Sequence, residues 1–142
     1  MVFCEVCGFG YAEDEKEDVI DHNIYHQNFL MLQEKYGPDY IMKSKVEEAM
    51  KLTGYNLHNA DYPLAIRLSG AKLCLKSWFS RSAISYGDEH PSFEEYVAMR
   101  LKQNIDQLPN LLPFTDDILE HLISQYGLKE GMDQHCYSYY QD

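Results

Sequence analysis

Two cysteines and two histidines near the amino terminus have the types and spacing of a metal site. Two residues separate Cys4 from Cys7, and three separate His22 from His26. Two thiolates on a tight turn and two imidazoles on one face of a helix form a tetrahedral set of four ligands, which suits zinc. Four protein ligands leave no position for water or substrate. We therefore expect a structural Zn²⁺ on which the first thirty residues depend to fold.

Apolar residues around the four ligands predict the elements that position them. Val2 lies two residues before the first cysteine, Tyr11 four residues after the second, and Val19 three residues before the first histidine. This is the core pattern of a ββα zinc finger, here with two extra residues in its middle loop. The sequence therefore predicts a short hairpin that carries the cysteines and a helix that carries the histidines.

This finger resembles the C2H2 family, and in detail the small finger that precedes the catalytic domain of cohesion-establishment acetyltransferases. The likeness covers about 25 of the 142 residues, in the string Cys4-x2-Cys7-Gly8, Tyr11 and Glu17-Asp18-x3-His22-x2-Tyr25-His26. No glycine-rich cofactor loop follows a strand in the remaining chain, so the acetyltransferase activity is not expected here. Short fingers that open a helical protein are also similar to proteins of bacterial prophages and mobile elements.

The finger helix has the wrong charge for reading a DNA duplex. If the first ligand histidine is helix position 7, the base-reading positions fall on Glu15, Asp18 and Asp21. Carboxylates accept a hydrogen bond only from cytosine and face the phosphate backbone with the same sign of charge. We therefore expect no duplex recognition by this finger.

Start and stop signals divide the rest of the chain into helices. Gly37-Pro38 ends the finger helix, Pro63 stands in the first turn of the third helix, and Ser92 with Glu95 forms a capping box. We expect helices over residues 18–36, 40–52, 61–86 with Asp61 as N-cap, 92–105, and 115–126 with Thr115 as N-cap. The prediction is a mainly α protein with a finger over 1–36, then a body of about four helices over 37–142 that ends in a tyrosine-rich tail.

Length, charge and composition bound the function. With 142 residues and 45% apolar content the chain suits a single folded domain. It shows no basic, then apolar, start typical of a signal peptide, so we expect a cytoplasmic protein. The net charge is −11, and residues 1–40 carry nine acidic and two basic side chains. Such a surface favours cationic partners over nucleic acid.

Two charged segments are candidate contacts with a partner. The acidic one is either a solvated turn or a row of carboxylates that imitates phosphates; it comprises Glu13, Asp14, Glu15, Glu17, Asp18 and Asp21. The basic one lies on the third helix; it comprises Arg67, Lys72, Lys76 and Arg81. It either contacts nucleic acid or an acidic protein surface, or it flanks the apolar stripe and pairs within the chain.

Three functional hypotheses follow. The first is a non-enzymatic, zinc-stabilised module that binds another protein, since no catalytic triad, phosphate loop or dinucleotide fingerprint is present. The second is an acidic inhibitor of a nucleic-acid-binding machine, such as a phage anti-CRISPR or anti-defence protein that mimics DNA. The third is a DNA-binding regulator that uses the basic helix.

Overall fold

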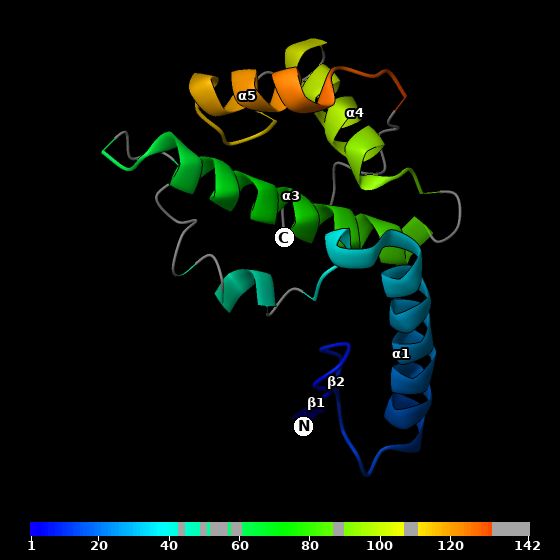
Figure 1. Cartoon of the computed structure of the whole chain (residues 1–142). Coiled ribbons are helices and arrows are strands. Elements are labelled where there is room, and N and C mark those ends of the chain that lie inside the picture. Colours follow the sequence, from blue (N-terminus) through cyan, green and yellow to red (C-terminus); the bar gives the residue numbers. More distant parts are fainter. Residues whose placement is uncertain are drawn as a thin grey trace.

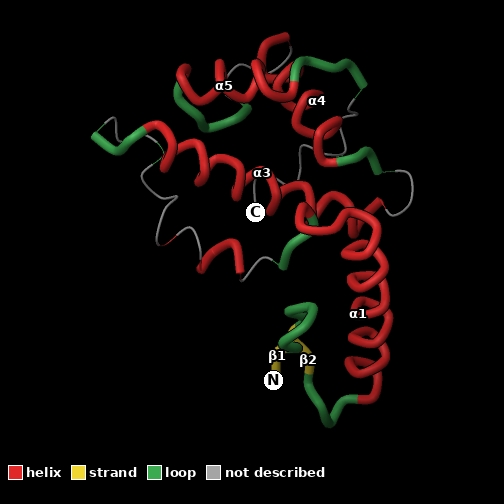
Figure 2. The backbone as a smooth tube through the Cα atoms, viewed as in Figure 1, coloured by secondary structure: helices red, strands yellow, loops and turns green. Residues whose placement is uncertain are grey.

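The computed structural model describes residues 1–42, 45–48, 51, 57, 61–86, 90–106 and 111–131. The protein is mainly helical and begins with a small antiparallel hairpin (Figures 1 and 2). The predicted fold class, a ββα start followed by a helical bundle, is confirmed. None of the described helices is both long and apolar enough to cross a membrane.

The hairpin and the first helix form the ββα unit. Strand β1 (Val2–Phe3) pairs with β2 (Gly10–Tyr11). Helix α1 (Lys16–Tyr36) starts two residues before the predicted position and ends where predicted. Gly37 ends it because its φ of 64° favours glycine, while its N–H donates to the carbonyl of Gln33.

The second predicted helix begins later than the sequence pattern indicates. The 3-10 turn η1 (Gly37–Asp39) is followed by an extended Tyr40, whose N–H donates to the carbonyl of Gly37. Residues 45–48 and 51 are helical, whereas 43, 44, 49, 50 and 52 lie outside the described residues. The start at residue 40 is therefore wrong. Tyr40 is fully buried and the N–H of Ile41 donates to Ser80, so tertiary contacts keep this segment extended.

Helix α3 (Leu64–Tyr86) is the central helix, and it contacts α1, α4 and α5 (Figure 1). Its buried side includes Ala71, Leu75 and Phe79, as the predicted stripe requires. Pro63, and not Asp61, directly precedes the first turn, because its carbonyl accepts the N–H of Arg67. The predicted N-cap is thus two residues too early.

Helix α4 (Phe93–Asp106) has the predicted start and a different buried face. The N–H of Glu95 donates to Ser92 Oγ at 3.3 Å, which confirms the N-cap half of the capping box. The Glu95 carboxylate accepts the Ser92 hydroxyl at 3.2 Å, where the motif has it accept the Ser92 backbone N–H. Ile105, predicted on the apolar face, is half exposed. Arg100 is fully buried instead, and it donates to Gln103 and lies over the ring of Tyr96.

Helix α5 (Asp116–Tyr126) follows Thr115, the predicted N-cap, but the capping hydrogen bond is made differently. The Thr115 hydroxyl donates to the carboxylate of Asp117, and that carboxylate accepts the N–H of Ile118. Asp117 therefore takes the role that the sequence assigns to Thr115. The helix ends at Gly127, whose N–H donates to the carbonyl of Ile123.

Two buried clusters form the core. The larger joins α3, α4 and α5 around Phe79, Tyr96 and Ile118. The smaller joins the finger to the body: it holds Cys7 of the finger, Phe29 and Leu32 of α1, Tyr40 and Ala83 of α3. Tyr36 packs against both. The finger is therefore continuous with the helical body through the second half of α1.

Candidate metal centre

The structure brings the four predicted ligands together. One ligand atom from each of Cys4, Cys7, His22 and His26 lies within 4.8 Å of all the others. Nδ1 of His26 is 3.4 Å from Sγ of Cys4. Zinc bond lengths of about 2.3 Å to sulfur and about 2.0 Å to nitrogen place such a pair about 3.5 Å apart on a tetrahedron. The arrangement is thus compatible with a bound metal ion.

Backbone hydrogen bonds shape the turn that carries the two cysteines. The N–H of Cys4 donates to the carbonyl of Phe9, and the N–H of Gly8 donates to the carbonyl of Cys4. Gly8 has a φ of 81°, which side chains other than glycine rarely adopt. The turn therefore holds both sulfurs on the side of the hairpin that faces α1.

Aromatic rings enclose the histidines. The ring of Tyr11 stacks on His22 with centroids 4.2 Å apart, and Phe9 stacks on the same imidazole at 5.9 Å. Phe9 also contacts Tyr25 at 5.0 Å. These contacts restrict the rotation of His22. The sequence pattern indicated Tyr11 as a supporting residue and missed Phe9, although its place two residues after Cys7 puts it beside the ligands.

The two thiols differ in acidity. Hydrogen bonding from the backbone N–H of Cys7 is the main cause that lowers the pKa of Cys4 to about 6. Burial raises the pKa of the Cys7 thiol, and the N–H of Phe9 opposes this effect. Zinc binds thiolates, so Cys4 is already in the form that a metal requires at neutral pH.

A buried nitrogen of His22 indicates whether a metal ion fits the four candidate ligands. Nε2 of His22 is buried and has no hydrogen-bond partner among the described residues. Burying such a nitrogen without a partner is unfavourable, and a metal bond would satisfy it. The two-sulfur, two-nitrogen donor set is also one that zinc prefers. The residues present therefore fit a zinc ion.

The acidic candidate residues lie on the loop before α1 and on its first turns. Asp18 is half-buried, and its carboxylate accepts the N–H of Ala12 at 3.0 Å, so this side chain stabilises the finger loop. The other side chains are exposed to solvent; they are Glu13, Asp14, Glu15, Glu17 and Asp21. The structure thus groups five exposed carboxylates at one end of the finger.

The basic candidate residues are dispersed along α3. Arg67 is buried and donates to the Asp117 carboxylate through two nitrogens, at 2.8 and 3.2 Å. Lys76 lies 3.9 Å from Asp39. Lys72 and Arg81 are half-buried. Arg67 therefore pairs within the chain, which is one of the two roles predicted for the basic segment. Its contact with a partner stays a prediction.

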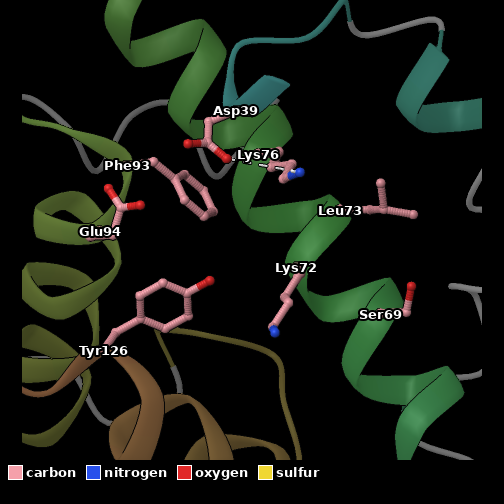
Figure 3. Close-up of a pocket in the computed structure, with 8 residues that line it drawn as sticks. All are labelled: Asp39, Ser69, Lys72, Leu73, Lys76, Phe93, Glu94 and Tyr126. Carbon is pink, nitrogen blue, oxygen red and sulfur yellow. Dashed lines mark ion pairs between the residues drawn. The ribbon is translucent and has the colours of Figure 1, made fainter. Parts of the chain in front are cut away.

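Lys72 and Lys76 also line a pocket of about 350 Å³ that the sequence pattern does not indicate (Figure 3). Asp39 and Glu94 stand at one side of it, and Tyr126 directs its hydroxyl toward Lys72. Burial raises the pKa of Asp39, an effect that Lys76 opposes. The pocket is formed by η1, α3, α4 and α5 together, so no local motif marks it.

In comparisons with known proteins, no family model, curated sequence or solved structure matched this chain. The resemblance of residues 4–26 to C2H2 fingers consequently rests on the ligands and apolar positions alone.

Proposed function

We propose that this chain is a non-enzymatic protein-interaction module whose amino-terminal finger is stabilised by a structural zinc ion. The observation that carries the proposal is the set of four convergent ligand atoms, with Nε2 of His22 buried and unpartnered among the described residues. Zinc would be held by Cys4, Cys7, His22 and His26. When bound, it would supply a cross-link between the hairpin and α1 and no open ligand position.

Continuity of the finger with the body supports a stabilising role for this ion. Cys7 is buried in the same cluster as Phe29 and Ala83, so a cross-link at the finger also fixes α1 against α3. The exposed carboxylates before α1 favour a cationic protein partner over DNA. We therefore propose that the finger presents a protein-binding surface.

The test measures the metal and its effect on folding. Purified protein should contain one zinc per chain by mass spectrometry of the metal. A Co²⁺-substituted sample should show the absorption of tetrahedral thiolate coordination. A strong chelator should lower the thermal midpoint of unfolding, and added Zn²⁺ should restore it. Protein without zinc, or protein that is indifferent to chelation, would end the proposal.

A second candidate function is an acidic inhibitor that competes with nucleic acid for a basic protein. The grouping of five exposed carboxylates at the finger loop supports it; these are Glu13, Asp14, Glu15, Glu17 and Asp21. Binding to such a target should weaken steeply with added salt, because counterions compete with the carboxylates. A complex that forms equally well at low and high salt would exclude this function.

A further inference from the structure

The outer face of α1 carries apolar side chains that no described element covers. Ile20, Ile24 and Met31 are 49%, 59% and 50% exposed. Spacings of four and seven residues place them on one side of the helix, where they form a stripe about three turns long. We call these three residues the outer stripe. Single exposed apolar residues are common on protein surfaces, whereas an aligned set on one helix is a candidate contact surface.

The two histidines of the candidate metal site and the outer stripe lie on opposite sides of α1. Ile24 lies two positions from both His22 and His26, which is about 160° around the helix from each. The histidines face the hairpin, and Phe29 and Leu32 continue that inner face into the smaller core cluster. Figure 1 shows the hairpin on one side of α1 and no labelled element on the opposite side. Apolar side chains thus lie on both sides of α1, with polar Gln27 between Ile24 and Met31 on the outer one, and among the described residues only the inner side is covered.

Carboxylates flank the outer stripe. Glu17 and Asp21 are exposed and lie beside Ile20 and Ile24 on the helix surface. The preceding loop adds three exposed acidic residues. A surface that covers this stripe must therefore satisfy several negative charges, which requires cationic side chains next to its own apolar ones.

We propose that the outer stripe binds a basic amphipathic helix of another protein, with its apolar side on Ile20, Ile24 and Met31 and its lysines or arginines on Glu17 and Asp21. The inference rests on the proposed function as an interaction module and names its surface and partner chemistry. Helices dock on such surfaces through side chains at i, i+4 and i+7. A second copy of this chain is the wrong partner, because each copy has a net charge of −11 and the same acidic flank.

A synthetic peptide tests the proposal on the intact zinc-loaded protein. The probe is a fluorescein-labelled helix of about 18 residues built from leucine and lysine with leucines on one face. Two control peptides are used. The first has the same composition in scrambled order, and the second keeps the order but has glutamate in place of every lysine. Anisotropy titrations should show saturable binding of the first peptide only. Amide shifts in a heteronuclear NMR spectrum should fall on α1.

Matched variants locate the contact. Ile24→Ser should weaken the affinity about tenfold, since it removes a central apolar anchor. Ile105→Ser, which replaces another exposed isoleucine on α4, should leave the affinity unchanged. Glu17→Lys combined with Asp21→Lys should weaken binding and reduce its salt dependence, whereas Glu120→Lys on α5 should not. Zinc content and the thermal midpoint are measured for each variant.

The outcomes separate this inference from the proposed function. Zinc-loaded protein that responds to chelation but does not bind the basic helix overturns the inference alone. Equal binding by wild type and Ile24→Ser, or NMR shifts confined to other helices, also overturns it. A dimer in sedimentation velocity that Ile24→Ser abolishes assigns the stripe to self-association and overturns the basic partner. Absence of zinc overturns the proposed function whatever the peptide does.

Discussion

Gly8 of the cysteine turn lies directly against Met42: a Cβ atom on this glycine would be 2.6 Å from the sulfur of that side chain. Its φ of 81° is unfavourable for alanine as well. The turn that carries the two cysteines of the candidate metal centre is therefore packed against the segment that follows η1. The local geometry of the metal site depends on a residue 34 positions away in the sequence.

Gly8→Ala should lower the free energy of unfolding by about 2 kcal/mol, mainly through backbone strain, because the flexible Met42 side chain can shift to admit the new methyl group. Urea denaturation of the zinc-loaded protein measures it. The control is a double-mutant cycle with Met42→Ala, which removes the clashing sulfur. The combined variant should be less destabilised than the two separate losses predict. If the losses of unfolding free energy in the two single variants sum to the loss in the double variant, Met42 does not clash with the new methyl group.

Cys7→Ser should abolish binding of one zinc per chain, because serine is a poor zinc ligand and the remaining set has three members. The loss of stability should be on the order of several kcal/mol. Cys74→Ser is the matched control: burial raises the pKa of Cys74 to about 11, so this thiol stays protonated and does not compete for the metal. Zinc content and thermal unfolding of the two variants distinguish a ligand from an ordinary half-buried cysteine.

Acid should destabilise the protein through His90. Its Nδ1–H donates to the carbonyl of Pro91 and its Nε2 accepts the Ser82 hydroxyl at 2.7 Å. Burial is the main cause that lowers the pKa of His90 to about 4 from its ordinary 6.5, and the charges of Arg100 and Lys35 lower it further. Between these two values the unfolded chain binds a proton that the folded chain does not. Stability is therefore lost as pH falls from above 6.5 toward 4, by roughly 2 to 3 kcal/mol between pH 7.5 and 4.5.

Urea titrations at both pH values measure this contribution of His90. His90→Asn should remove this pH-dependent contribution. The difference in the free energy of unfolding between wild type and variant should therefore be smaller at low pH than at high pH. Contributions from the finger are the same in both proteins and cancel in that difference. His121→Asn, at an exposed position on α5, should behave as wild type. An unchanged pH slope in His90→Asn would contradict the assignment.

Asp117→Asn should lower the thermal midpoint, because it weakens the ion pair with buried Arg67. Hydrogen bonds from that guanidinium are the main cause that holds the pKa of Asp117 well below its usual range. The stabilisation is present above the ordinary pKa of aspartate and disappears as pH falls through the lowered value in the folded protein. Asp116→Asn, one position earlier and exposed, is the control and should have a smaller effect at pH 7.

Local signals in the sequence determined the convergence of the four candidate metal ligands, the ββα start and several helix ends. Cys4, Cys7, His22 and His26 are predictable because a short hairpin and one helix hold them, so their spacing alone places them together. Gly37 and the Ser92–Glu95 capping box are equally local, since each acts within one turn of the backbone.

Only the tertiary structure decided which side chains are buried where several elements meet. Arg67 is inside the fold because Asp117, 50 positions away, accepts its guanidinium, and Ile105 is exposed because α4 presents Arg100 to the core instead. Helix α1 shows the same limit: it is apolar on two sides, and periodicity alone does not say which side a partner element covers. The hairpin and α3 cover the histidine side and leave Ile24 in solvent, since burial depends on contacts between distant segments that no local pattern encodes.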